Sequence, residues 1–319
     1  MAGRGRSLPA PVVVKLTLLK RLQPKNPGYQ RYEGWCMRFG VALLLYFNLP
    51  VEEKFADPKS PNGLAHWFDF TWAADPEIMG ILKWILIPVL AFYVFGRLRW
   101  LALPYMFTLS LAVGTLKNSQ RAGEIAHVYQ ALTMVLLVQM IWHFYYQVRI
   151  WIRKPHHFHP GWTARAMEIF VTQSALVGIY LTTAVTKMIE SGGMWLWQVR
   201  KIGVELERTW QQKYYHYLEE QGPQWALAMK DFITENPWAA VFIFGPGLIA
   251  EIIVPIALYG RRRALVIGIL LIILHIGAIY IMRLTFWQNI ALLVIFFVNV
   301  PYWIVSASSA ATRRARASG

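Results

Sequence analysis

The chain has 319 residues, of which 56% are hydrophobic, and it contains 15 Trp, 15 Tyr and 17 Phe. This composition excludes an ordinary soluble domain, because several apolar runs reach the roughly 20 residues that a helix needs to cross a bilayer. The net charge of +15 does not indicate nucleic-acid binding, since basic residues gather in the cytoplasmic loops of membrane proteins. A single cysteine, Cys36, excludes an intramolecular disulfide. We therefore predict an all-α polytopic membrane protein.

Residues 1–31 form a basic N-terminal segment, which we predict to be cytoplasmic. The first apolar stretch in it, PVVVKLTLL, is interrupted by Lys15 and is too short to span the bilayer or to act as a cleavable signal peptide. Two interpretations stay open for this stretch: an amphipathic helix in the membrane interface, or a solvated arm.

The transmembrane domain is predicted to cover residues 32–304 and to contain about eight helices, with a basic cytoplasmic tail at 305–319. Short connections join the second span to the third and the seventh to the eighth, so each of these pairs is expected to be antiparallel. The expected spans are 32–49, 79–95, 100–116, 125–146, 167–189, 239–259, 264–284 and 286–304.

The distribution of charge predicts the orientation of these spans. Clusters of Lys and Arg occur in alternate connections and at both ends of the chain, whereas acids predominate in the first and fifth connections. Cytoplasmic segments carry the excess of basic residues. Both termini are therefore predicted to be cytoplasmic, in a multi-pass protein of the cell (inner) membrane.

The fifth connection, residues 190–238, is the longest segment that does not span. Its stretch VELERTWQQKYYHYLEE mixes charges with Trp210 and three tyrosines, which prefer the membrane interface. We predict a helix over 199–219 that lies along the outer surface, and a second short helix over 224–234.

Ionisable residues within a span are expensive and are candidate functional groups. Lys187 and His127 fall at matching depth near the outer ends of two spans, with Glu124 at i−3 from His127, while Glu251 and His275 lie near the middle of theirs. Lys187 is either a working group or a lysine that extends to the headgroups. Pairing with Glu190 at i+3 would hold the pKa of the ammonium up and would count against a role as a base.

The remaining polar residues have structural interpretations beside the functional one. Glu251 lies in FGPGLIAEIIVP, where Pro255 removes a helical hydrogen bond, so it either lines a cavity at a bend or pairs with a basic or amide group. His127 alone is more often a helix-to-helix hydrogen-bonding group. His143 and Lys83 are interpreted as packing or snorkelling residues and Glu168 as interfacial. The run KPHHFHP lacks further metal ligands, so no metal site is predicted.

Four motifs, in order, resemble the HTTM family, the membrane domain shared with vitamin K-dependent γ-carboxylases. They are GEIAHVYQALTMVLL, IYLTTAVTKMIESGGMW, GLIAEIIVPIAL and RRRALVIGILLIILHIGAIYIM. The resemblance extends from about the first predicted span to the eighth. It implies a lyase-type activity that uses a reduced quinone similar to vitamin K, with Lys187 as the base and His127 and His275 as further catalytic residues. Glu251, Gln130 and Trp195 are the candidates for binding the cofactor.

Two alternatives stay open beside this enzyme hypothesis. The large lumenal part of the carboxylases, which presents a peptide glutamate, has no match in this chain, and neither does the aromatic fifth connection. The chain is then either a membrane factor that matures or assembles a peptide or protein partner, or a structural subunit of a larger complex. Under all three hypotheses we expect membrane lipid to surround the helices of the protein.

Overall fold

The computed structural model describes residues 28–49, 63–120, 129–152, 162–217 and 223–317. Every regular element in these ranges is helical. The α-helices are α2 (Arg31–Asn48), α3 (Pro76–Phe95), α4 (Arg99–Gln120), α5 (Gln130–Trp151), α6 (Ala164–Glu190), α7 (Trp195–Gln198), α8 (Ile202–Tyr217), α9 (Gln224–Glu235), α10 (Pro237–Ile253), α11 (Arg261–Ile281), α12 (Trp287–Leu293) and α13 (Val300–Ala317). The shorter elements are η1 (Gly63–His66), η2 (Thr71–Ala74), η3 (Val199–Lys201), η4 (Val254–Tyr259) and the π-helix η5 (Val294–Val298).

Six segments of the described chain are long and apolar enough to cross a membrane, which indicates a multi-pass membrane protein. They are α3, α5, α6, α10 with η4, α11, and residues 287–312 across α12, η5 and α13. The predicted spans at 32–49 and 100–116, which became α2 and α4, are not among the six, so the count of eight is not confirmed. In α2 the reason is three ionisable residues, Arg31, Glu33 and Arg38.

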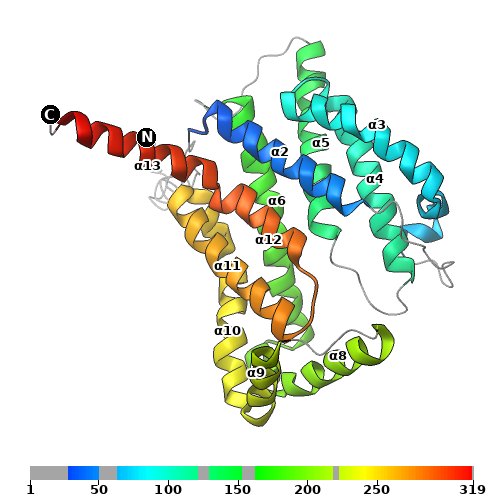
Figure 1. Cartoon of the computed structure of the whole chain (residues 1–319), viewed down its shortest axis with the longest axis vertical. Helices are drawn as coiled ribbons and strands as arrows, with labels where there is room; N and C mark the ends of the chain where they lie inside the picture. Colours follow the sequence, from blue (N-terminus) through cyan, green and yellow to red (C-terminus); the bar gives the residue numbers. More distant parts are fainter. Residues whose placement is uncertain (1–27, 50–62, 121–128, 153–161, 218–222, 318–319) are drawn as a thin grey trace, which may run out of the picture.

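The long helix α6 lies at the centre of the molecule (Figure 1). It contacts α5 on one side, and α10, η4 and η5 on the other. Helices α2 to α5 form one part of the bundle and α10 to α12 the other, while α13 projects away from both (Figure 1). Helices α7 to α9 gather at the end where α6 finishes, and we call these three helices with η3 the cap.

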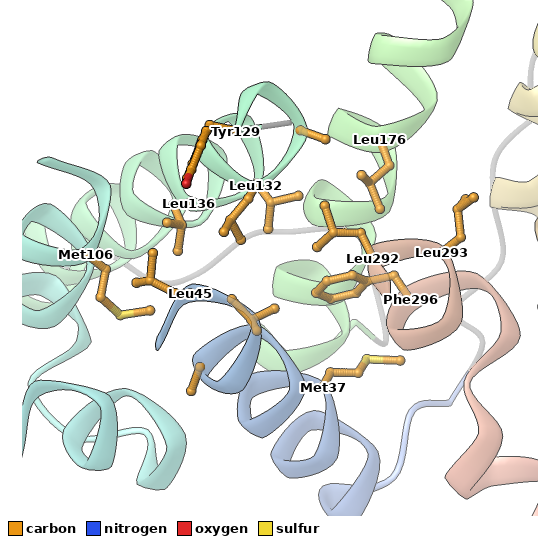
Figure 2. Packing of buried hydrophobic residues seen from close by; sticks show 14 of the residues in the cluster. Met37, Leu45, Met106, Tyr129, Leu132, Leu136, Leu176, Leu292, Leu293 and Phe296 are labelled. Atoms are coloured by element: carbon orange, nitrogen blue, oxygen red, sulfur yellow. The ribbon is translucent and has the colours of Figure 1, made fainter. Parts of the chain in front are cut away.

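The apolar core joins the two parts of the bundle around α6 (Figure 2). Leu45 of α2, Leu132 of α5, Leu176 of α6 and Leu292 of α12 are all buried in one cluster. Large apolar side chains also face outward, as with Phe242, whose exposed fraction is 78%. Such exposure is unusual for a soluble monomer and fits helices surrounded by lipid.

The cap has the two helices that the sequence predicts between 199 and 234, as η3 with α8 and as α9, with residues 218–219 outside the described part. A second apolar cluster, which includes Leu206 of α8, Ile233 of α9 and Phe244 of α10, holds the cap against the bundle. The Trp210 indole also donates a hydrogen bond of 2.8 Å to the carbonyl oxygen of Ile281. Its position on an outer membrane surface stays a prediction.

The α-helix is interrupted at the position of Pro255, where the sequence predicts an irregular span. Helix α10 continues through Pro246 but ends at Ile253, and the chain continues as the tighter η4. Proline has no amide hydrogen and its ring clashes with the preceding turn, so an α-helix rarely continues through it.

A buried ion pair ties the first helix to the last third of the chain. Glu33 of α2 has no exposed surface and pairs with Arg261 of α11, while the Asn299 amide donates to the same carboxylate at 2.6 Å. Arg261 is the first of the three arginines that begin α11, and its guanidinium is taken up by this contact. Asn299 follows η5 with a left-handed backbone, φ 51°, that asparagine tolerates better than most residues.

Candidate functional site

Lys187 of α6 forms an ion pair with Glu251 of α10. The ammonium Nζ lies 2.8 Å from Oε1 and 2.7 Å from Oε2 of the carboxylate. The lysine side chain is 31% exposed and the glutamate side chain 6%. The ion-pair partner of Lys187 therefore comes from a different helix. Glu190, the acid three residues further along α6, is exposed.

Trp195 lies above the same ammonium group, with its ring centroid 5.4 Å from Lys187 Nζ. The chain reaches this position because it turns back after α6 at Gly192 and Gly193, whose φ angles are +60° and +82°. Glycine adopts this left-handed conformation without steric cost and commonly ends helices in this way. The Gly193 amide closes the turn by donating to the Met188 carbonyl at 2.7 Å.

His275 of α11 lies beside this pair, and its Nε2 is 2.7 Å from the Tyr180 hydroxyl. Tyr180 precedes Lys187 by two turns on α6, so both face the same side. Lys187 lies within electrostatic range of His275, and Glu251 within that of Tyr180. Sequence reasoning missed Tyr180, although its i−7 spacing from Lys187 was a readable signal.

Asn289 of α12 completes this region. Its side chain lies close to the Tyr180 hydroxyl, and its Oδ1 is buried with no hydrogen-bond partner among the described residues. A buried acceptor left unpaired is costly. Any ligand that reaches this position therefore gains by donating a hydrogen bond to it.

The predicted site residues fall into three groups: those that lie together, one that lies elsewhere, and one outside the described residues. The structure brings Lys187, Glu251, His275 and Trp195 into one region between α6, α7, α10 and α11. Gln130 is an exposed residue at the start of α5, whereas the ion pair lies between α6 and α10. His127 lies outside the described residues, as do Glu124 and the KPHHFHP run.

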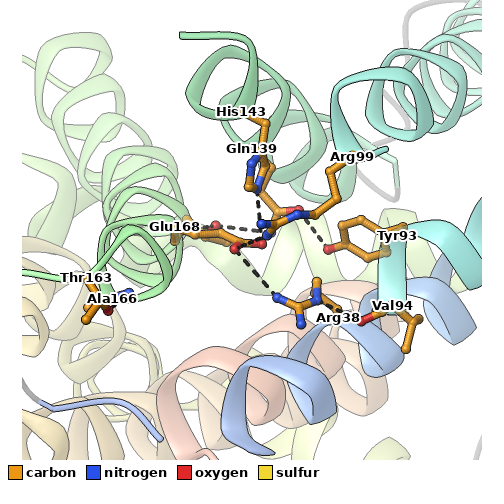
Figure 3. A network of polar contacts seen from close by, with 10 residues as sticks. Arg38, Tyr93, Val94, Arg99, Gln139, His143, Thr163, Ala166 and Glu168 are labelled. Atoms are coloured by element: carbon orange, nitrogen blue, oxygen red, sulfur yellow. Dashed lines mark hydrogen bonds and ion pairs between the residues drawn. The ribbon is translucent and has the colours of Figure 1, made fainter. Parts of the chain in front are cut away.

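A second polar cluster surrounds Glu168, near the other end of α6 (Figure 3). Arg99 Nη1 lies 2.5 Å and Arg38 Nη1 3.6 Å from Glu168 Oε2, and His143 Nε2 lies 3.3 Å from Oε1. Glu168 is only 4% exposed, so it is buried among helices, with its arginine partners coming from α2 and α4. Its interfacial depth in the membrane stays a prediction.

Further hydrogen bonds extend this cluster into the core. Gln139 of α5 accepts from the Tyr93 hydroxyl at 2.7 Å and donates to the Thr172 hydroxyl at 3.1 Å. A cavity with room for about one water molecule lies between Arg38, Gln139, Glu168 and Phe296. The buried histidine His143 belongs to this cluster, which fits the packing interpretation. Lys83 also faces protein, since its ammonium donates to the Leu49 carbonyl at 2.9 Å.

An apolar layer separates the two polar regions along α6. The buried polar residues Thr172 and Gln173 extend the Glu168 side of α6 to within seven residues of Tyr180, which is about 10 Å along a helix. Leu176 lies between Gln173 and Tyr180 and packs with buried leucines of α5 and α12 (Figure 2). The Lys187 region and the Glu168 cluster are therefore two separate polar sites.

Comparisons with known proteins place no further constraint on this site. No family model, curated protein or solved structure matches the chain. The resemblance to the HTTM family consequently remains a prediction that rests on the four motifs.

Proposed function

We propose that the chain is an HTTM-type membrane enzyme that uses Lys187 and Glu251 to take a proton from a reduced quinone or a similar lipid-soluble substrate. The observation that supports this best is the pairing of an intramembrane lysine with a buried glutamate, beside Tyr180 and His275. Such groups are expensive within a membrane and are usually kept for function.

Eight spans with cytoplasmic termini are part of the same proposal. Helices α2 and α4 have polar residues, but each packs along a neighbour that is apolar enough to span: α2 on α3, and α4 on α3 and α5. Buried polar groups of a spanning helix are tolerated where they face other helices and not lipid.

The ion pair supplies a route to a basic amine. A protonated lysine cannot act as a base, but transfer of one proton from Nζ to Glu251 leaves a neutral amine and a neutral acid. Because a low-dielectric environment penalises charges, this neutral pair is closer in energy to the ion pair than it would be in water. The amine is then free to accept a proton from a substrate hydroxyl.

The other polar groups fit a hydroxylated ring held next to the pair. The unpaired Oδ1 of Asn289 is a hydrogen-bond acceptor for such a hydroxyl. Tyr180 and His275 are placed to stabilise negative charge on an oxygen that loses its proton. When bound, a reduced quinone would supply the carbon framework that oxygen attacks, as the family resemblance implies.

The apolar layer around Leu176 determines on which side of the bundle the proton is released. It closes the path from the Lys187 region towards the Glu168 cluster, whereas the Lys187 side chain is 31% exposed. The proton therefore leaves at the cap end of the bundle, which is the outer face in the proposed topology.

A non-catalytic role in maturing or assembling a partner is the second candidate. The cap favours it because Trp197, Trp225 and Trp238 are each more than half exposed. Tryptophan is enriched in protein interfaces and at membrane surfaces alike.

Oxygen-dependent consumption of reduced vitamin K by the purified chain in phosphatidylcholine vesicles tests the proposal. We expect Lys187→Met to lower the rate at least about a hundredfold, the usual contribution of a positioned base, with unchanged helix content. The rate of Glu251→Gln, whose side chain cannot take the proton, should fall by a similar factor. Lys201→Met, at an exposed lysine of the cap, is the matched control. No consumption by the wild type, or equal rates in all variants, would favour the non-catalytic role.

A further inference from the structure

Helix α7 lies over Lys187, the cationic half of the ion pair with Glu251. The ring centroid of Trp195, the first residue of α7, is 5.4 Å from Lys187 Nζ, and the ring also packs against the second apolar cluster. The Lys187 side chain is nevertheless 31% exposed, so this cover is incomplete. A displacement of α7 would therefore change how accessible the ammonium group is from outside the protein.

Helix α7 is weakly fixed to the rest of the fold. None of its four residues is buried, and the exposed fractions of Leu196 and Trp197 are 43% and 58%. Before it, Gly192 and Gly193 have left-handed φ angles, and within the described part of the chain no atom lies within 4 Å of a Cβ built at either glycine. After it, Val199 is buried in the second apolar cluster. An element with so little buried apolar surface opens at a low cost in free energy, and the two glycines can absorb the change in backbone angles.

One arginine joins α7 to the start of α10. The guanidinium carbon of Arg200, in η3, lies 4.4 Å from the ring centroid of Trp197 in α7 and 4.4 Å from that of Trp238 in α10. The two rings meet edge to face, with their centroids 5.9 Å apart. Arg200 Nε is buried and has no hydrogen-bond partner among the described residues. A cation this close to an aromatic face is attracted by the ring, so the two ring contacts hold α7 in its position.

We propose that α7 is a gate over the Lys187–Glu251 pair, and that Arg200 is the positioning residue that keeps this gate closed. When the contact between Arg200 and Trp197 opens, the chain rotates at the two glycines and carries Trp195 away from the ammonium group. The open state admits the lipid-soluble ligand to the pair, and the closed state excludes water from it. This role rests on the proposed function, because only a pair that receives a ligand needs a gate, but the motion of α7 can be measured without turnover.

Chemical labelling of Lys187 measures the gate directly. The full chain in phosphatidylcholine nanodiscs would be treated with formaldehyde and cyanoborohydride, which methylate accessible amines, and the rate at Lys187 would be followed by mass spectrometry. We expect Arg200→Gln to raise this rate several-fold, and Arg200→Lys, whose cation can still lie against both rings, to restore most of the wild-type rate. Arg208→Gln is the matched control, because it removes the same charge from an exposed arginine of the cap.

Amide hydrogen exchange in the wild-type chain keeps the test independent of how the variants fold. The Gly193 amide donates to the Met188 carbonyl at 2.7 Å, so its protection reports rotation at the glycines. We expect its protection factor to be at least about tenfold below those of the hydrogen-bonded amides of α9. Equal labelling of Lys187 in Arg200→Gln and Arg208→Gln would overturn the gate, as would protection at Gly193 equal to that of α9. A wild type that consumes no quinone but gives the expected labelling and exchange would contradict the proposed chemistry and not the motion of α7.

Discussion

Replacement of Glu168 by glutamine tests whether the buried arginine cluster stabilises the bundle. Glutamine keeps the shape of the side chain but removes its negative charge. The change leaves Arg38, whose side chain is 8% exposed, and Arg99, at 22%, without their shared carboxylate. Removal of one partner of a buried ion pair typically destabilises a protein by about 3–5 kcal/mol.

The structure places Glu168→Gln at the lower end of this range. Arg38 retains its hydrogen bond to the Val94 carbonyl at 3.0 Å, and the partial exposure of Arg99 allows some solvation. We therefore expect a loss of about 3 kcal/mol in the free energy of unfolding. The control is Glu205→Gln, which removes an exposed ion pair with Arg208 on α8 and should change stability by less than about 0.5 kcal/mol.

Unfolding of each variant in mixed micelles with increasing denaturing detergent gives the required free energies. The double variant Glu168→Gln/Arg99→Gln should recover part of the loss, because it removes an unpaired buried cation. The reasoning fails if Glu168→Gln is no less stable than Glu205→Gln, since the carboxylate would then contribute nothing that an amide cannot supply.

Two further predictions concern packing and pH. Gly268→Ala should destabilise the protein by about 1–3 kcal/mol, because the new Cβ would lie 2.8 Å from Phe297 Cβ. Gly277→Ala in the same helix meets no atom within 4 Å and should be neutral or stabilising by up to about 1 kcal/mol; equal melting temperatures would contradict this contrast. In the cap, the hydrogen bond from Lys230 holds the pKa of Glu207 below its usual range. A depressed carboxyl pKa stabilises the folded state above the unfolded value and loses this effect as pH falls through the folded value. Because Glu207 is 47% exposed, the effect should stay below about 1 kcal/mol. The protection factors of the amides in α8 and α9, which correct for the pH dependence of intrinsic exchange, should therefore fall below about pH 4.5 in the wild type. An equal fall in Glu207→Gln would exclude this pair as its cause.

The sequence by itself determined the helical class, the apolar segments and the cap helices. These properties are local, because a run of about 20 apolar residues or a mixed charged and aromatic stretch can be recognised without its neighbours. The turn at Gly192 and Gly193 and the break before Pro255 were also readable, since both follow from the backbone chemistry of single residues.

Only the tertiary structure decided which polar groups meet. Lys187 pairs with Glu251, 64 positions away, and not with the nearby Glu190. Glu168 is enclosed by arginines of α2 and α4, partners that its position in the sequence does not reveal. The physical reason is that a charge in an apolar bundle needs a partner at its own depth on a facing helix. Depth can be counted along a sequence, but the rotation and neighbours of each helix are set by packing across the whole bundle.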